Sequence, residues 1–188
     1  DKAEFPRDKT CGDGVTGKSL SILHEMGLSE RITSTRKIAC DGVIIGAPNE
    51  QELRIDISSP EDPLSAFCIE RSELDNILYD SACEMVLADG GKVVCDWVVA
   101  PLIENEEVVG IETKSGDSYR ATRIIGAGGY SCPISRWVLD MNDVETQDRR
   151  HYSSAIREYW TGISGNSGEF EIHFVKGILP GYFWIFPI

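Results

Sequence analysis

Apolar residues recur at helical spacing in three segments of the chain. Leucine and methionine residues lie three apart over 16–26, and a glycine directly follows, as at many helix ends. A longer series begins after Ser72, a residue type that caps helices, and its apolar positions trace one face. The positions of that face are Leu74, Ile77, Leu78, Ala82, Met85 and Val86. The pattern therefore predicts a long helix that ends at Gly90-Gly91, and a shorter helix over 154–160.

Strand-like patterns fill most of the remaining sequence. The apolar run 38–45 is followed by turn residues and then by alternating apolar and charged residues over 53–57, which predicts a hairpin with a half-buried second strand. Short polar turns separate three later apolar segments, which predict a three-stranded meander: 93–102, 108–113 and 119–125. Apolar residues alternate again over 170–174, and 182–186 is the densest aromatic run. We therefore expect a mixed α/β (α+β) protein.

The overall composition is that of a globular protein. Hydrophobic residues make up 41% of the 188 residues and charged residues 26%. The formal net charge of −13 argues against nucleic-acid binding and against an anionic-membrane surface. No apolar run has the length of a membrane span, no secretory signal is found, and the six cysteines show neither C-x-x-C nor zinc-type spacing. We expect a cytoplasmic protein with reduced thiols and no metal site.

Motifs that define an active site by themselves are not found. Residues 12–19 fit the letters of G-x-G-x-x-G and of the Walker pattern G-x-x-x-x-G-K-[ST], but they follow a polar loop rather than a predicted strand, so we expect no phosphate-binding loop there. No G-x-S-x-G for a nucleophilic serine is present. The three histidines, His24, His151 and His173, are scattered, and we expect them to be surface or core residues rather than catalysts. These patterns alone indicate a soluble α+β domain and no particular activity.

Three segments say more when they are considered together. The first follows the pattern Pro-x-x-Lys-x-Cys-Gly-[Asp/Gly]-Gly at Pro6, Lys9, Cys11, Gly12, Asp13 and Gly14. The second follows Arg-x-x-[Phe/Leu]-Asp at Arg71, Leu74 and Asp75, and the third follows Tyr-x-Trp-x-Phe-Pro at Tyr182, Trp184, Phe186 and Pro187. In this order and spacing, the segments resemble the geranylgeranyl reductase family of FAD-dependent oxidoreductases, which are built like para-hydroxybenzoate hydroxylase.

This resemblance implies two partial domains. A Rossmann-like FAD-binding domain that includes the meander would cover 1–35 and 68–135, and a mainly antiparallel substrate-binding domain would cover 36–67 and 136–188. The family's G-x-G-x-x-G segment would precede the chain and its Gly-Asp flavin motif would follow it, so we expect an internal part of a longer protein. Gly128 stands where flavoprotein hydroxylases have the aspartate of a Gly-Ala-Asp-Gly segment, which argues against the nicotinamide-related role of that segment.

The resemblance assigns contacts with FAD to eight positions: Asp1, Cys11, Gly12, Asp13, Gly14, Arg71, Val99 and Ala100. Asp1 would accept hydrogen bonds from ribose hydroxyls, Arg71 would pair with phosphate or ribose oxygens, and residues 99–100 would offer backbone groups to the adenine. The structural alternatives are a terminal charge for Asp1, an ion pair with a neighbouring carboxylate for Arg71, and strand packing for residues 99–100.

The glycines of the first motif would let the backbone approach the flavin ring closely, beside a helix N-terminus that favours negative charge. The alternative is a helix-capping loop without a ligand. Cys11 is the candidate catalytic residue, as a proton donor or a steric guide, and the alternative is a small buried hydrophobic residue.

The aromatic run near the end is the candidate substrate-binding surface. Tyr182, Trp184 and Phe186 alternate and therefore point to one face of a strand, which suits a long polyprenyl chain. The alternative is a sheet packed on an ordinary core.

The resemblance implies an enzyme that reduces C=C bonds of a geranylgeranyl or other isoprenoid group by hydride transfer from reduced FAD, with NAD(P)H or another reductant as electron donor. Its partner would be an isoprenoid lipid or pigment, with membrane contact only through that lipid, and the oligomeric state is left open. Two alternatives remain: a flavin-dependent hydroxylase or halogenase, and an inactive part that only binds.

Overall fold

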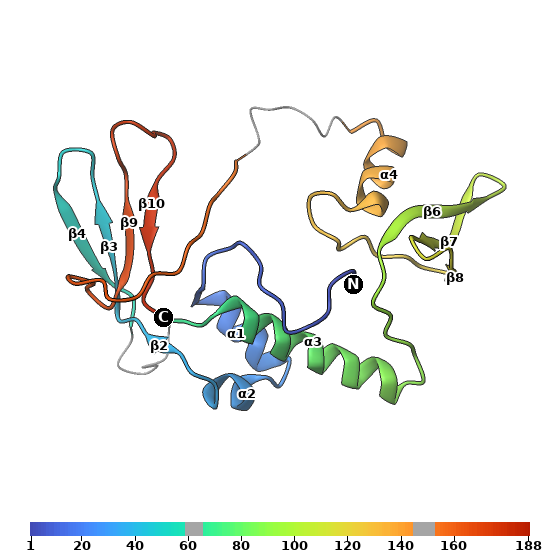
Figure 1. The fold of residues 1–188 in the computed structure, drawn as a ribbon, viewed down its shortest axis with the longest axis horizontal. Helices are drawn as coiled ribbons and strands as arrows, with labels where there is room; N and C mark the ends of the chain where they lie inside the picture. The colour runs from blue at the N-terminus through green and yellow to red at the C-terminus, as the bar shows by residue number, and fades with distance from the viewer. Residues whose placement is uncertain (59–65, 145–152) are drawn as a thin grey trace. The chain divides into compact units, whose positions relative to one another are not determined.

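The computed structural model describes residues 1–58, 66–144 and 153–188, which form two compact units (Figure 1). The smaller unit comprises Asp1–Phe5 and Cys83–Ser154, and the larger unit comprises Pro6–Ala82 and Ala155–Ile188. Each unit contains segments that are far apart in the sequence. The predicted α/β class with mainly antiparallel strands is confirmed.

Two helices follow the short strand β1 (Gly14–Thr16) in the larger unit. Helix α1 (Lys18–Glu25) confirms the first predicted helix. It ends before Gly27, whose φ of +72° lies in the left-handed region that glycine adopts without steric cost. Helix α2 (Ser29–Thr33) was not predicted, because five residues are too few to show a period.

The core of the larger unit forms where these helices meet strand β5 (Ala66–Cys68) and the start of helix α3 (Arg71–Ala88). Its buried residues are Val15, Leu23, Leu28, Ile32, Phe67 and Ile69, and Leu20, Leu74, Ile77 and Leu78 pack against them. The predicted apolar face of α3 is therefore confirmed in its first turns. It is wrong at the far end, where Met85 is 70% exposed, and Ser72 lies inside the helix rather than at its cap.

The predicted strand over 38–45 is two strands in two sheets. Strand β2 (Ile38–Ala39) belongs to the sheet β1-β5-β2, and strand β3 (Gly42–Gly46) belongs to the sheet β10-β9-β3-β4. Between them, the N–H of Cys40 still bonds to Ala66, whereas the carbonyl of Asp41 accepts the N–H groups of Ile57 and Ser58. The chain thus changes sheets within two residues, which an apolar pattern does not reveal.

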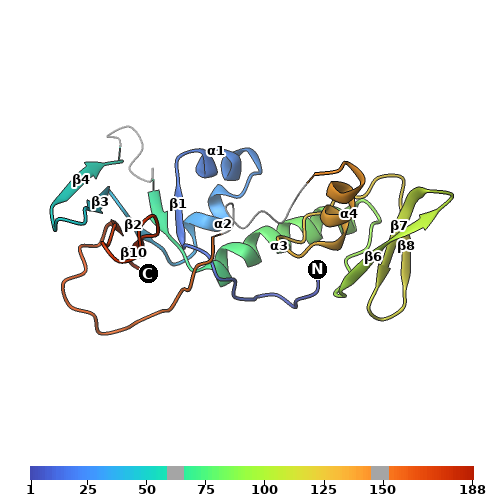
Figure 2. The ribbon, with the colours of Figure 1, turned by 90° about the horizontal axis from the view of Figure 1, so that it is seen from above.

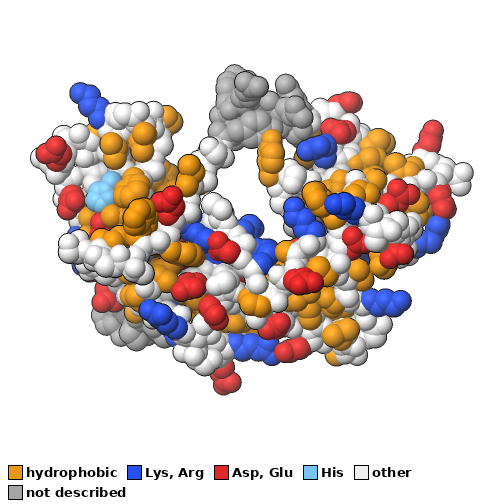
Figure 3. Space-filling view, viewed as in Figure 1, with side chains coloured by type: hydrophobic (Ala, Val, Ile, Leu, Met, Phe, Trp, Pro, Cys, Tyr) orange, Lys and Arg blue, Asp and Glu red, His pale blue; other side chains and the backbone are white. Residues whose placement is uncertain are grey.

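The four-stranded sheet carries the aromatic run. Strand β3 pairs antiparallel with β4 (Glu52–Asp56) and parallel with β9 (Phe170–His173), and β10 (Phe183–Ile185) pairs antiparallel with β9. The predicted hairpin is confirmed, but its second strand is not half-buried, since Leu53 is 61% exposed. Hydrophobic side chains gather on the visible face of this sheet (Figure 3).

The smaller unit contains the predicted meander, formed by β6 (Val98–Glu104), β7 (Glu107–Thr113) and β8 (Ser118–Arg120). The first strand begins later than its apolar run and the third is shorter than predicted. Helix α4 (Pro133–Met141), which was not predicted, lies beside β6 (Figures 1 and 2). Its proline occupies the first turn, where the missing N–H costs nothing.

The helix predicted over 154–160 is wrong, because these residues have no regular secondary structure. Their side chains instead contact a distant loop, described below. His151 lies outside the described residues, and none of the helices in the described part is both long and apolar enough to cross a membrane. All six cysteines are free thiols.

Candidate functional site

The loop that carries the first motif is organised around the carboxylate of Asp13, which is 3% exposed. Its Oδ1 atom accepts the N–H of Arg71 at 3.1 Å, at the N-terminus of α3, and the hydroxyl of Tyr159 at 2.8 Å. The Asp13 carbonyl also accepts the N–H of Ile69 at 2.9 Å. Asp13 therefore acts as a structural link between the loop, the helix start and the segment after residue 152.

Arg157 completes this arrangement and was overlooked in the sequence. Its side chain is 7% exposed and pairs with Asp8, and its Nη1 atom lies 3.1 Å from the carbonyl of Lys9 and 3.5 Å from Asp13 Oδ1. The guanidinium also lies 4.3 Å from the ring centre of Tyr159. No periodic pattern marks these residues, because they lie in an irregular segment.

The electrostatics of the site follow from this burial. Desolvation raises the pKa of Asp13 above 3.8, although the Tyr159 hydroxyl and the Arg157 charge oppose the shift. Burial, followed by the bond to Asp13, raises the pKa of Tyr159 as well. The hydrogen bond from Arg157 lowers the pKa of the exposed Asp8.

Arg71 lies next to this cluster, and its side chain forms the predicted alternative, an ion pair. Its Nε atom lies 2.9 Å from Asp75 Oδ1, one turn along α3, and Arg7 approaches the other Asp75 oxygen at 3.2 Å. The Asp75 side chain is 9% exposed, so the pair is largely shielded from water. The structure thus brings Arg71 to the loop, and its predicted contact with FAD stays a prediction.

The glycines of the motif lie against aromatic rings. A Cβ atom on Gly12 would approach Phe186 Cε2 to 3.0 Å, and one on Gly14 would approach Phe170 Cε1 to 2.6 Å. These two rings meet edge to face with centroids 5.1 Å apart. The first and third motifs, about 170 residues apart in the sequence, are therefore in direct contact.

The loop carries hydrogen-bond donors that suit the electron-rich end of a reduced flavin ring. Cys11 is exposed, and the N–H groups of Cys11 and Gly12 find no acceptor among the described residues. The Nε atom of Arg157 is also buried without a hydrogen-bond partner in the described structure. A buried donor such as this Nε atom is normally satisfied, whereas the N–H groups of Cys11 and Gly12 are accessible, so the arrangement is consistent with a flavin bound beside the loop.

The three predicted substrate residues form one aromatic row. The ring centroids of Tyr182 and Trp184 are 5.9 Å apart, and those of Trp184 and Phe186 are 6.4 Å apart. Phe174 extends the row, 6.0 Å from Tyr182. The shared face predicted from the alternation is present, and Tyr182, between Phe174 and Trp184, is 50% exposed.

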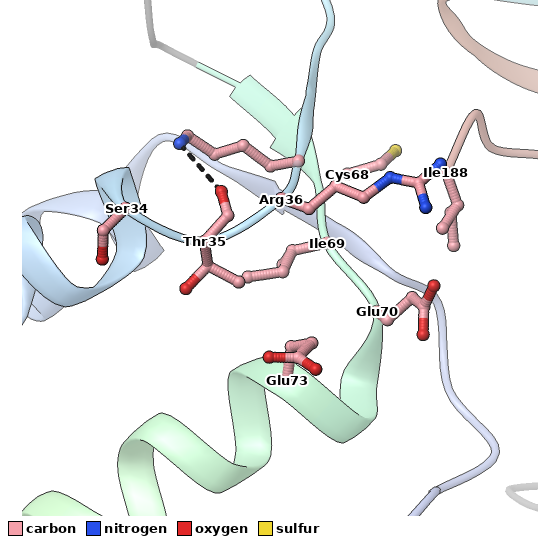
Figure 4. Close-up of a pocket in the computed structure, with 9 residues that line it drawn as sticks. Ser34, Thr35, Arg36, Cys68, Ile69, Glu70, Glu73 and Ile188 are labelled. Carbon is pink, nitrogen blue, oxygen red and sulfur yellow. Dashed lines mark hydrogen bonds between the residues drawn. The ribbon is translucent and has the colours of Figure 1, made fainter.

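A pocket of about 440 Å³ lies beside the start of α3. Figure 4 shows Arg36 extending toward Ile188, with Glu70 and Glu73 on the α3 side. Cys68 also lines it, and its Sγ atom lies 3.8 Å from that of Cys40. Charged and hydroxyl side chains make up much of the lining, so this pocket does not suit an apolar polyprenyl chain.

The smaller unit holds the other predicted contacts. Val99 lies at a register shift between β6 and β7, where backbone groups leave the strand ladder. Val99 and Ala100 line a cavity of about 500 Å³ with Trp97 and Trp137. Asp1 is tied locally, since its carboxylate accepts the N–H of Ala3 at 2.9 Å.

The glycine segment of this unit leads to Cys132, before α4. A Cβ on Gly128 would approach Cys132 Sγ to 3.2 Å, so glycine has a packing reason here. Burial alone would raise the pKa of Cys132, but hydrogen bonds with Ser135 and nearby backbone groups lower it to about 7. Among the described residues no cluster of metal-binding side chains is found.

Curated proteins with similar sequences are all considerably longer than the chain. It is 29% identical to menaquinone reductase of Mycobacterium tuberculosis over 197 residues, which covers 100% of the chain and 45% of that protein. It is 30% identical to an uncharacterized protein of Methanosarcina barkeri over 191 residues, with coverage of 100% and 43%. The chain thus spans less than half the length of these relatives, and no family model matches it.

Solved structures with the same fold include proteins that are described as flavin- or FAD-dependent. A mutant of PqsL of Pseudomonas aeruginosa, a probable FAD-dependent monooxygenase, has a TM-score of 0.67 at 12% identity and covers 100% of the chain and 50% of its own. A geranylgeranyl bacteriochlorophyll reductase-like protein of Thermoplasma acidophilum has a TM-score of 0.64 at 17% identity, with coverage of 97% and 45%. The flavin-dependent brominase Bmp2 has a TM-score of 0.57 at 23% identity, with coverage of 77% and 33%. The chain therefore shares its fold with a part of each of these proteins.

Proposed function

We propose that the intact protein is an FAD-dependent oxidoreductase that reduces a C=C bond of an isoprenoid lipid. The contact between the two motifs carries this proposal, because Gly12 of the Cys11–Gly14 loop lies against Phe186 of the aromatic row. A bound FAD would supply the hydride. A loop with free N–H groups beside a row of aromatic rings suits a flavin next to an apolar chain.

The chain's own residues would bind, orient and protonate. The aromatic row would fix the prenyl chain and exclude water, because an unactivated alkene reacts only when it is held closely. Cys11 is exposed on the loop and would donate the proton that accompanies the hydride. Residues 1–35 and 68–135 would hold FAD, with Asp1, Arg71, Val99 and Ala100 at its adenosine and phosphate parts, and 36–67 and 136–188 would hold the substrate.

The names of the relatives favour a lipid of this class. Menaquinone, the substrate named for the mycobacterial relatives, is a quinone with an isoprenoid side chain. We therefore propose a prenylated lipid or pigment as substrate and NAD(P)H or another reductant as electron donor, in the cytoplasm, with membrane contact through the lipid alone and without nucleic-acid binding.

A flavin-dependent hydroxylase or halogenase is the second candidate, because PqsL and the brominase share the fold. Both reactions would insert an atom from oxygen or halide, whereas the proposed reaction adds only hydrogen.

The test is product analysis with the intact, flavin-loaded protein. Supplied with a chemical reductant and a geranylgeranylated lipid or menaquinone, it is expected to yield a product that gains one pair of hydrogen atoms per double bond in the isoprenoid chain. Fragment masses locate the gain after any quinol has been reoxidised in air. A product with an added oxygen or halogen would support the second candidate. A purified intact protein without flavin absorbance would contradict both and favour a binding body without activity.

A further inference from the structure

Arg157 is the residue through which an otherwise irregular segment is attached to the Cys11–Gly14 loop. It contacts Asp13 within this loop and Asp8 and Lys9 just before it, although it lies more than 140 positions away in the sequence. Tyr159 adds a second attachment through its hydroxyl, which donates to Asp13. The segment over 153–160 has no secondary structure of its own, so these side chains determine where it lies.

The guanidinium of Arg157 is more buried than a structural ion pair at a surface requires. Its side chain is 7% exposed, whereas that of Arg54, which also binds two carboxylates, is 45% exposed. Despite this burial, the Nε atom of Arg157 has no hydrogen-bond partner in the described structure. A buried donor without a hydrogen bond is costly, so this atom is expected to meet an acceptor that the described residues do not supply.

The charges around the loop balance closely. Arg7, Arg71 and Arg157 face Asp8, Asp13 and Asp75, and each member of the set contacts at least one of opposite sign. Removal of Arg157 alone would leave this group with one uncompensated negative charge beside the loop. A negative charge there would disfavour the anion that a reduced flavin becomes.

We infer that Arg157 is a positioning residue of the flavin site, which holds the Cys11–Gly14 loop through Asp13 and Lys9 and supplies the positive charge beside it. This inference rests on the proposed function. Tyr159 supports Arg157 by fixing the shared Asp13 oxygen. Arg157 therefore affects both the affinity for flavin and its reduction potential.

The experiment compares four variants of the intact protein by FAD titration and by the midpoint potential of the bound flavin. Arg157→Gln is expected to weaken FAD binding by about tenfold or more, the scale of one charge-assisted hydrogen bond, and to lower the potential. Arg157→Lys restores the charge and is expected to restore the potential but not the full affinity. Tyr159→Phe is expected to weaken binding less, without a change in potential.

Arg54→Gln is the matched control, since it removes an arginine with two carboxylate partners from the same unit. Both readouts are expected to stay at the wild-type values. A wild-type protein that does not bind FAD contradicts the proposed function itself. A wild-type protein that binds FAD, with Arg157→Gln equal to it in affinity and potential, overturns the inference alone. Weaker binding with an unchanged potential also overturns it, since that is the result of a merely structural role. If Arg157→Gln does not fold, Arg157→Lys and Tyr159→Phe decide: wild-type affinity in both overturns the inference.

Discussion

Asp13 shows how a motif residue can be required by the fold itself. The carboxylate caps the start of α3 through the N–H of Arg71 and anchors Tyr159. Any oxygen acceptor could make these two hydrogen bonds. The Asp13 carboxylate is also charged, and its desolvation by burial raises the pKa of Asp13. Asp13 therefore holds two parts of the structure together through hydrogen bonds, but the burial of its charge lowers the stability of the folded state.

This cost gives a testable pH dependence. Because the folded-state pKa of Asp13 lies above 3.8, the folded state binds the proton more tightly than the unfolded state, and stability is lost as pH rises from the unfolded to the folded value. In Asp13→Asn this contribution is absent. Urea unfolding is expected to show that the stability of the wild type, relative to the variant, falls as pH rises above about 4 and then levels off. A relative stability that grows with pH would show instead that the attraction to Arg157 outweighs the desolvation.

Cys132 has the opposite shift and a different readout. Its pKa of about 7 means that much of the thiol is ionised at neutral pH, through hydrogen bonds with Ser135 and the local backbone. Alkylation of Cys132 with iodoacetamide, followed by peptide mass spectrometry, is expected to reach half its maximal rate near pH 7. Ser135→Ala is expected to move that midpoint upward. The exposed Cys95 serves as the internal control in both proteins. An unmoved midpoint in Ser135→Ala would remove Ser135 as the cause.

At the scale of elements, strand β1 depends on the absence of one methyl group. A Cβ on Gly14 would lie 2.6 Å from the ring of Phe170, which is 4% exposed and packed among Cys40, Ala66 and Cys68. The ring has no room to retreat, so Gly14→Ala is expected to lower the free energy of unfolding by about 1–3 kcal/mol. Gly177→Ala, at a site with nothing within 4 Å and no positive φ, is the control and is expected to change stability by less than about 0.5 kcal/mol. Equal losses in urea unfolding would show that β1 and Phe170 are not in contact as described.

Strand β10 has two faces with different expected sensitivities. If Trp184 faces a substrate, the alternation in the sequence predicts that Phe183 on the other face lies in the core. This prediction is wrong, because Phe183 is 55% exposed. Phe186, in contrast, packs edge to face on Phe170. Phe186→Ala is therefore expected to lower the free energy of unfolding by roughly 3 kcal/mol and Phe183→Ala by only about 1 kcal/mol.

In the intact protein, Trp184→Ala is expected to reduce turnover of a prenyl substrate while bound flavin is retained. The checks are urea unfolding, flavin content and alkene reduction; a larger loss of stability for Phe183→Ala than for Phe186→Ala would reverse the two faces.

The elements that the sequence predicts correctly are those with a sustained period. Helices α1 and α3, the hairpin of β3 and β4, and the meander all follow apolar spacing. The split at Cys40-Asp41 is not predictable in this way, because one apolar run supplies strands to two sheets. The contact between Gly12 and Phe186 follows the motif resemblance, whereas Arg157 and Tyr159 were missed because a residue that acts through tertiary contacts alone leaves no local signal.

At the scale of the whole molecule, the comparisons and the motifs agree on one type of fold. Structural neighbours at up to 23% identity share the architecture, and longer relatives match the chain along its full length. The described part contains the loop, the helix start and the aromatic row that the resemblance predicts. What it shares with these proteins is therefore the scaffold around the proposed site, and the proposed chemistry depends on how an intact protein would hold FAD.

FAD affinity is the property in which the 188-residue chain and an intact protein are expected to differ most. Dinucleotide folds hold the pyrophosphate on a glycine-rich turn between a strand and a helix N-terminus. The letters of G-x-G-x-x-G occur here at residues 12–17, but Gly14–Thr16 form strand β1 rather than such a turn. The chain also spans only 45% of the mycobacterial relatives. Titration calorimetry is therefore expected to show that the 188-residue chain binds FAD weakly or not at all, whereas an intact protein binds it tightly.

Arg71 provides the matching test within an intact protein. Its guanidinium is already paired with Asp75, so a role toward FAD would require Arg71 to serve the phosphate or ribose in addition to this ion pair. Arg71→Ala is expected to lower the FAD affinity by about tenfold. The flavin-free protein is expected to stay folded, with a lower melting temperature, because Arg7 still pairs with the shielded Asp75. An unchanged affinity would leave Arg71 with the ion pair alone. Sub-micromolar binding of FAD by the 188-residue chain would show, in turn, that the loop and its arginines hold the cofactor without a pyrophosphate anchor.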